Sequence, residues 1–180
     1  MKNATVARNY AGALLEVARR AKAVEQFGQL LDAVAGAFGA DPAILAVMMS
    51  PRVTKAAKSR VLERALQGVA PAPFVRFLTA VVRRGRQGLL PDISSAYQDA
   101  MDLHFNRVHA SVVTAHAVDA ALSKTIAERL TQAVGRTVLP TFRTDPAILG
   151  GVVVRVGDRV FDASIRRRIQ ALRHRLLHAR

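Results

Sequence analysis

The sequence contains no cysteine and no tryptophan, and only 5% of its 180 residues are aromatic. The absence of cysteine excludes disulfides, thiolate nucleophiles and cysteine-ligated zinc, so an intracellular protein is the simplest interpretation. The shortage of aromatic residues disfavours RNA-binding modules that stack bases on a sheet. Every window of about 20 residues contains charges or helix breakers, so we expect no membrane-spanning helix. Residues 1–10 also lack the apolar core of a secretory signal, and no export is expected.

Motifs for nucleotide binding and catalysis are missing as well. The sequence has no GxxxxGK[ST] loop and no G-x-S-x-G element, and its 13 acidic residues are scattered. Asp158 and Asp162 bracket a predicted strand, where turn formation and helix capping account for them. Only His174 and His178 have the i, i+4 spacing of metal ligands, and no carboxylate lies near them in the sequence. We therefore predict no enzymatic activity, no cofactor and no metal site.

Positive charge dominates the polar residues. The chain has 27 Lys and Arg residues against 13 Asp and Glu residues, which gives a formal net charge of +14. Most of this charge comes from arginine. Such an excess can neutralise the phosphates of a nucleic acid or attract acidic protein partners, or it can reflect the codon preference of a genome. Charge alone leaves these alternatives open.

The first part of the chain has the apolar spacing of α-helices. Apolar residues that recur every three or four positions predict six helices, from a first helix over residues 6–21 to a sixth that runs from residue 90 toward 107. Asp41-Pro42 predicts an N-cap followed by a first-turn proline, and Ser50-Pro51 repeats this pattern.

Beyond residue 107 the pattern changes to short runs rich in β-branched residues. Strands are predicted at 110–117, 137–144, 152–156 and around 160–161, and Pro140 predicts that the second strand lies at a sheet edge or contains a bulge. Asp119 is expected to cap a helix between the first two strands, and a last helix begins near Ser164. The predicted fold is mainly α, with an N-terminal six-helix bundle (1–106) followed by a small α/β domain (107–180).

Three segments carry a resemblance to a known family: VARNYAGALLEVA at 6–18, RRGRQGLLPDI at 83–93 and LGGVVVRVGDRVFDASIRRRIQAL at 149–172. The last segment is the most specific, because it orders a glycine pair, two strands joined by Gly-Asp, and Asp-x-Ser-Ile. Together the segments resemble the delta subunit of the bacterial rotary (F-type) ATP synthase, a relative of the mitochondrial oligomycin-sensitivity-conferring protein. The resemblance covers nearly the whole chain and implies the same two-domain architecture as the apolar spacing.

The resemblance implies a non-catalytic stator connector. In the family, this subunit joins the catalytic head to the peripheral stalk, so that proton-driven rotation is coupled to ATP synthesis. The N-terminal helices of the head's alpha subunits bind a hydrophobic groove between its first and fifth helices. Carried over by motif, that groove contains Tyr10, Ala13, Leu14, Val17, Ala80, Val81 and Arg84. We expect the Tyr10 ring to anchor the contact with its hydroxyl at the rim, although burial in the core is the common fate of such residues.

The resemblance also implies a second contact, between the C-terminal domain and the b subunits of the peripheral stalk. The residues assigned to it are Val154, Val156, Ile165 and Ile169. The implied location is the cytoplasmic face of the bacterial plasma (inner) membrane, peripheral through the complex, with no direct bilayer insertion and no nucleic acid. The alternative from the charge is a basic RNA- or ribosome-associated protein, whose binding to phosphates would weaken steeply with salt.

Overall fold

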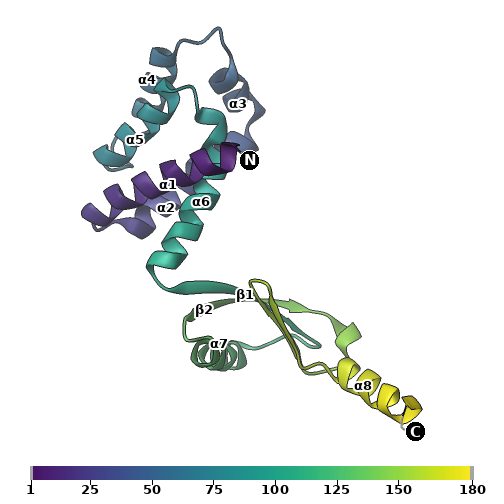
Figure 1. Ribbon diagram of the computed structural model, residues 1–180. Helices are drawn as coiled ribbons and strands as arrows, with labels where there is room; N and C mark the ends of the chain where they lie inside the picture. The colour runs from purple at the N-terminus through teal and green to yellow at the C-terminus, as the bar shows by residue number, and fades with distance from the viewer. Residues whose placement is uncertain (1, 179–180) are drawn as a thin grey trace. The chain divides into compact units, whose positions relative to one another are not determined.

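The computed structural model describes residues 2–178 and divides the chain into two compact units, residues 1–102 and 103–180. The predicted boundary at 106 and 107 lies at the start of the first strand. The first unit contains α1 (Lys2–Arg20), α2 (Val24–Ala40), α3 (Pro42–Met49), α4 (Lys55–Leu66), α5 (Ala72–Arg83), the 3-10 helix η1 (Gln87–Leu89) and most of α6 (Leu90–His104) (Figure 1). The second unit contains β1 (Arg107–Thr114), α7 (Ala120–Val134), β2 (Thr137–Thr144), η2 (Pro146–Ile148), β3 (Val152–Val156), β4 (Arg159–Asp162) and α8 (Ile165–His178). The chain is mainly helical, as predicted.

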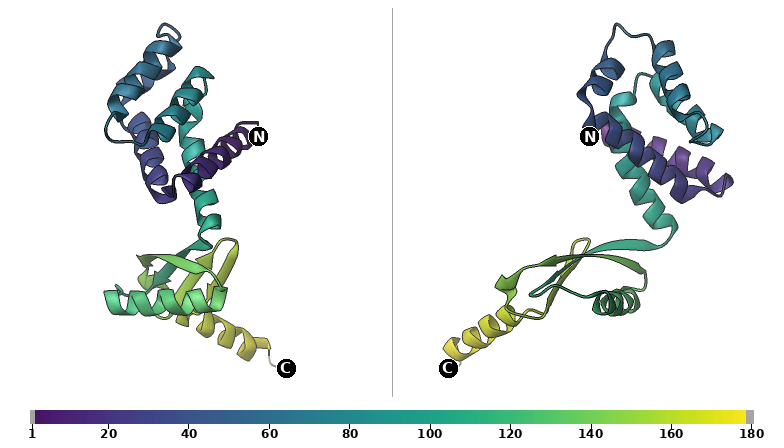
Figure 2. Two further views of the ribbon diagram at one scale, coloured as in Figure 1. Left: turned by 90° about the vertical axis from the view of Figure 1, so that its left-hand side faces the viewer. Right: turned by 180° about the vertical axis from the view of Figure 1, so that it is seen from behind.

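Apolar side chains from all six helices fill the core of the first unit. Helices α1 and α2 lie side by side, as do α4 and α5 (Figures 1 and 2). Phe27 of α2 and Phe74 of α5 are fully buried and meet edge to face, with ring centroids 5.5 Å apart. The large aliphatic side chains of this unit that are also fully buried are Leu14, Leu31, Leu78, Val81, Val82, Leu90 and Ile93. These residues recur at three- and four-residue spacing, which places them on one face of each helix.

Tyr97 of α6 combines complete burial with a hydrogen bond across the core. Its hydroxyl donates to the carbonyl oxygen of Val24, at 2.9 Å. Burial disfavours the charged phenolate and raises the pKa of Tyr97 to about 12. An unfolded tyrosine loses its proton near pH 10, so between about pH 10 and 12 the unfolded state binds fewer protons than the folded state. The stability contributed by protonated Tyr97 is therefore complete below pH 10 and is lost as the pH rises to about 12.

We expect Tyr97→Phe to lower the free energy of unfolding by about 1–2 kcal/mol at neutral pH, because the carbonyl of Val24 loses its buried donor. The same variant should lose less stability than the wild type between pH 10 and 12. Denaturant unfolding across this pH range measures both effects. Tyr10→Phe is the matched control, since the Tyr10 hydroxyl has no hydrogen-bond partner in the described part of the chain. Equal destabilisation by the two substitutions would contradict the assigned hydrogen bond.

The helix ends test the predicted capping residues. The Asp41 carboxylate accepts from the backbone N–H of Ala43, and the Asp119 carboxylate accepts from that of Leu122, so both predicted caps are confirmed. The prediction for Ser50-Pro51 is wrong. Ser50 Oγ accepts from the N–H of Arg52 in a turn, whereas α4 begins only after Thr54, which accepts from the N–H of Ala57.

The second unit is a four-stranded mixed sheet in the order β2-β1-β3-β4, in which β1 and β2 are parallel and the other pairs are antiparallel. Helix α7 connects the two parallel strands and packs on one face of the sheet, over Ala110, Val112, Val138 and Val154. Strand β2 lies at the edge, which is one of the two positions that Pro140 predicted. The first strand begins three residues earlier than predicted and α6 is correspondingly shorter, because Asn106 adopts a left-handed conformation (φ 51°) that ends the helix.

Candidate partner-binding surfaces

Helix α1 carries two adjacent apolar stripes, one buried and the other partly exposed to solvent. Ala7, Ala11, Leu14 and Ala18 form the inner stripe, with exposed fractions of 0–1%. Val6, Tyr10 and Val17 are half-buried on the neighbouring stripe, and Ala13 is exposed there. The sequence prediction grouped Leu14 with the outer residues. The structure assigns Leu14 to the core, so this side chain presents no surface to a partner.

Helix α5 places a matching face next to the outer stripe of α1. Phe77, Ala80 and Arg84 follow one another at three- and four-residue spacing, and Phe77 is half-buried while the other two are exposed. The rings of Tyr10 and Phe77 meet edge to face, with centroids 6.2 Å apart, and join the two helices. Val81 is fully buried, so like Leu14 it belongs to the core.

We define the α1–α5 face by its described members. They are Tyr10, Ala13 and Val17 of α1, Phe77 and Ala80 of α5, and Arg84, the C-cap of α5. The sequence prediction missed Phe77, although its spacing to Ala80 and Arg84 was a usable signal. The face has apolar members in its middle and a guanidinium group at the end of α5, which suits an amphipathic helix with an acidic residue.

Arg86, in the loop after α5, contacts the ring of Tyr10. The guanidinium carbon of Arg86 lies 5.7 Å from the Tyr10 ring centroid, within the range of a cation–π contact. The Tyr10 hydroxyl is buried and has no hydrogen-bond partner among the residues that the structure describes, whereas the sequence prediction placed it at the rim. A shallow hollow of about 420 Å³ lies beside this contact and is lined by Asn3, Val6, Met49, Gly85, Arg86, Gly88 and Leu89.

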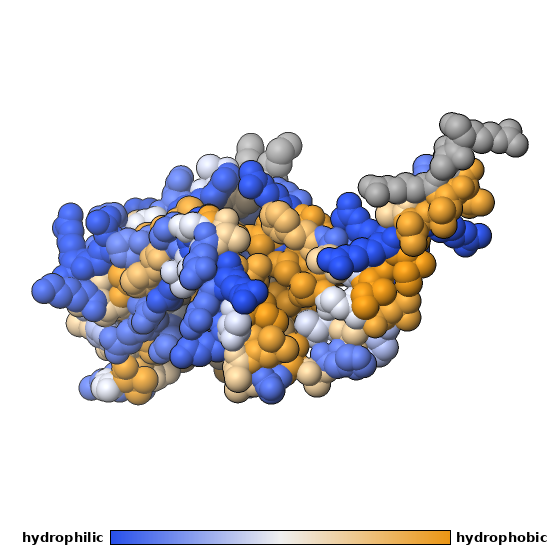
Figure 3. Space-filling model, turned by 90° about the horizontal axis from the view of Figure 1, so that it is seen from below, coloured by the Kyte–Doolittle hydropathy of each residue, from blue (hydrophilic) through white to orange (hydrophobic). Residues whose placement is uncertain are grey.

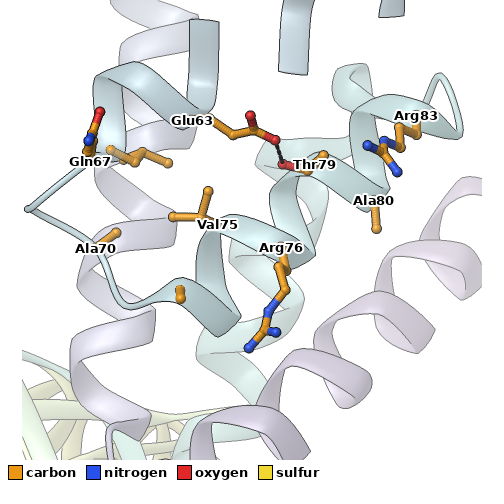
Figure 4. Close-up of a pocket in the computed structure, with 10 residues that line it drawn as sticks. Glu63, Gln67, Ala70, Val75, Arg76, Thr79, Ala80 and Arg83 are labelled. Carbon is orange, nitrogen blue, oxygen red and sulfur yellow. Dashed lines mark hydrogen bonds between the residues drawn. The ribbon is translucent and has the colours of Figure 1, made fainter. Parts of the chain in front are cut away.

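A hollow of about 630 Å³ lies between α4 and α5, on the other side of Ala80 (Figure 4). Glu63 of α4 and Thr79 of α5 bridge it, with the Thr79 hydroxyl donating to the carboxylate over 3.4 Å. Arg76 and Arg83 of α5 line the same hollow. Ala80 therefore borders both this hollow and the α1–α5 face.

A third hollow, of about 560 Å³, is lined by apolar residues of α2, α3, α4 and the loop that follows α4. Val47 and Val61 reach it although they are 48% and 55% exposed. The remaining lining residues are Leu30, Ala33, Val34, Ala37, Phe38, Ala43, Ile44, Met48, Leu62, Ala65, Leu66 and Val69. This surface was not predicted from the sequence, because apolar spacing on three helices does not reveal that they leave a gap.

The four residues predicted to meet the stalk separate into two groups. Val154 is 5% exposed in the core beneath α7, and Val156 is half-buried against the same core. Ile165 and Ile169 lie on α8 and are 43% and 53% exposed. The structure thus places Val154 among the residues that hold the sheet to α7, and it leaves the two isoleucines at the surface.

In segment 149–172, which carries the most specific part of the resemblance, Asp162 and Ser164 form a turn and a helix cap, as the sequence suggested for Asp162. The Asp162 carboxylate accepts from the N–H of Ser164, and the Ser164 hydroxyl accepts from the N–H of Arg167 at the start of α8. The hydrogen bonds from Ser164 hold the pKa of Asp162 below its usual value, with smaller contributions from Arg167 and Arg166. Gly151 approaches the backbone of Ala163 and completes this junction.

The described residues contain no group of three or more His, Cys, Asp or Glu side chains that could hold a metal ion. The side chain of His178 lies outside the described part, so the predicted absence of a metal at the His174 and His178 spacing stays a prediction. Between residues 2 and 178, no single helix is long and apolar enough to cross a membrane. Helices α2 and α3 together have the length and composition, but the chain bends by 97° between them.

The chain is similar to known proteins along nearly its whole length. The family model described as ATP synthase delta (OSCP) subunit matches residues 6–176. The chain is 46% identical to the ATP synthase subunit delta of Gemmatimonas aurantiaca over 172 residues, which cover 96% of this chain and 93% of the relative. It is 32% identical to the ATP synthase subunit delta of Myxococcus xanthus, with 98% of each chain covered.

The fold has a counterpart among solved structures. A chain in the cryo-EM structure of the Toxoplasma gondii mitochondrial ATP synthase hexamer superposes with a TM-score of 0.63 at 24% identity, over 95% of this chain and 97% of that chain. The structure thus defines a mainly helical, two-unit protein with exposed apolar helix faces in each unit. The chain belongs to the ATP synthase delta (OSCP) subunit family, whose members are structural stator components of the F-type ATP synthase.

Proposed function

We propose that this chain is a non-catalytic connector that joins the alpha subunits of the catalytic head to the b subunits of the peripheral stalk. In this role it resists the torque of the rotor, so that proton-driven rotation is coupled to ATP synthesis. The observation that carries the proposal is the α1–α5 face, an apolar surface left uncovered beside a well-packed core. Family membership adds the identity of the assembly.

The head contact is proposed at the α1–α5 face. An amphipathic helix from an alpha subunit would lie along α1 and α5 with its apolar residues on Tyr10, Ala13 and Phe77. Ala13 and Ala80 are small, so the backbone of the incoming helix can approach closely. Arg84 would then lie beside the polar edge of that helix, where an acidic residue finds its partner. Burial of apolar area, at about 25 cal/mol per Å², supplies most of the free energy of such a contact.

The stalk contact is proposed at α8. Ile165 and Ile169 face outward there, whereas Val154 and Val156 act indirectly, by fixing the sheet from which α8 departs. The proposed location is the cytoplasmic face of the plasma membrane, held there through the other subunits. A connector of this kind performs no bond chemistry and needs no cofactor.

The test is to purify the tagged chain from detergent-solubilised membranes of its own organism and identify its companions by mass spectrometry. We expect alpha and b subunits of the ATP synthase, retained after nuclease treatment. A tagged chain with Tyr10→Asp and Ile169→Asp is the control and should lose both subunits. Recovery of ribosomal proteins that nuclease removes, with no ATP synthase subunits, would replace the connector by the RNA-associated alternative.

A further inference from the structure

Helix α8 carries a narrow apolar seam that nothing in the described chain covers. Ile165, Ile169, Leu172 and Leu176 are 43%, 53%, 59% and 71% exposed. The start of the helix is tied to the sheet unit, where the Ile165 N–H donates to the carbonyl oxygen of Gly150 and the helix packs against η2. Figure 3 shows apolar surface (orange) along this projecting helix, with hydrophilic surface (blue) beside it.

The spacing of the seam is that of a coiled coil. Its four residues are separated by four, three and four positions, which is the alternation of the d and a positions of a heptad. Leu177, which is 70% exposed, widens the seam at its C-terminal end. From Ile165 to Leu172 the large apolar residues occupy a and d positions alone, a seam that is narrower than the apolar face of a helix that lies on a membrane surface or packs into a globular core. A single partner helix therefore fits this seam better than a bilayer does.

Arginines border the seam on both sides. Arg166 and Arg173 directly follow the d-type residues Ile165 and Leu172, and Arg168 directly precedes Ile169. In a heptad these are the e and g positions, whose charges face the partner helix and set its identity. All three side chains are exposed. Two copies of α8 would bring arginine against arginine, so the same charges oppose self-association.

We propose that α8 pairs with an acidic amphipathic helix of the peripheral stalk, one whose own apolar seam is bordered by glutamate or aspartate. This inference rests on the proposed function and adds the chemistry of the partner. It also assigns a role to part of the positive charge of the chain. The helix has 14 residues, about 21 Å of length, which is too short for a stable coiled coil from apolar contacts alone. Charge pairing along both edges should therefore be needed for the contact, and salt should weaken it.

The experiment titrates the full-length chain against two probes by calorimetry. One probe is the soluble part of the b subunits from the same organism. The other is a synthetic four-heptad helix with an Ile/Leu seam and Glu at every e and g position. The variant is Arg166→Glu/Arg173→Glu, and the matched control is Arg129→Glu/Arg143→Glu, which changes the net charge equally at two exposed positions outside α8.

We expect both probes to bind the wild type and the control alike, and to bind the α8 variant at least about fivefold more weakly at 0.15 M salt. A probe with Lys in place of Glu should reverse this preference. If the b subunits bind the α8 variant as well as the wild type, the acidic-helix inference fails while the connector stands. If the b subunits bind no form of the chain, the proposed stalk contact itself fails. Dimerisation of the chain through α8, or tighter binding of α8 to anionic vesicles than to either probe, would also overturn the inference.

Discussion

Gly151→Ala is expected to destabilise the second unit by about 3 kcal/mol, the largest stability effect that we predict for a single methyl group in this chain. Gly151 has φ +78°, a left-handed conformation that costs other residues about 1–2 kcal/mol. The added Cβ would also collide with the carbonyl oxygen of Ala163 and lie 3.3 Å from the Cα of Ser164. Both are backbone atoms that cannot rotate away, so the junction between β4 and α8 must shift.

Gly157→Ala is the matched control. Gly157 is also left-handed, at φ +57°, but nothing lies within 4 Å of its hypothetical Cβ. Its substitution should lower the free energy of unfolding by about 1 kcal/mol, which is the cost of the left-handed conformation alone. Hydrogen exchange on the full-length chain reports each unit separately, and the strands β1–β4 should lose protection in Gly151→Ala far more than in Gly157→Ala. Equal losses of protection in the two variants would show that the close approach of residue 151 to Ala163 does not contribute to stability.

Much of the fold could be predicted because its signals are local. Asp41, Asp119 and Ser164 mark helix starts by the same mechanism, a side-chain oxygen that accepts a hydrogen bond from an N–H of the first turn. The failure at Ser50-Pro51 is local too. The pair has the composition of a helix start, but Ser50 closes a turn, and its carbonyl oxygen accepts a hydrogen bond from the ammonium of Lys58 on the following helix.

The candidate surfaces were harder to predict, because exposure depends on neighbours that are distant in the sequence. Spacing identifies the apolar positions of α1, but only the packing against α2 and α5 decides that Leu14 turns inward and Ala13 outward. The same holds for the second unit. Val154 and Ile169 are equally apolar, yet α7 covers the first and nothing in the described chain covers the second. Phe77 was missed for a related reason, since an aromatic residue on a core helix is assigned to the core by default.

Ala13→Asp is expected to weaken binding of a peptide from the N-terminal helix of the alpha subunit at least about tenfold, or roughly 1.4 kcal/mol. The substitution puts a carboxylate in the middle of the α1–α5 face, where the bound helix would remove it from water without a basic partner. The melting temperature of the free chain should change little, because Ala13 is exposed and Asp can remain solvated there. Peptide titration and thermal unfolding of the same variant measure the two quantities.

Gly12→Asp places the same charge on the same helix, at an exposed position next to Ala13 on the side away from Tyr10, with open space around it. This control should bind the peptide like the wild type, so a loss seen only in Ala13→Asp localises the contact to the outer stripe. A collapse of stability in Ala13→Asp would instead mean that the outer stripe is packed like the inner one, where a buried unpaired carboxylate costs several kcal/mol. Unchanged affinity in a stable variant would remove Ala13 from the head contact. Since this contact depends on apolar burial and that of α8 on charge pairing, raising the salt concentration should weaken the second far more than the first.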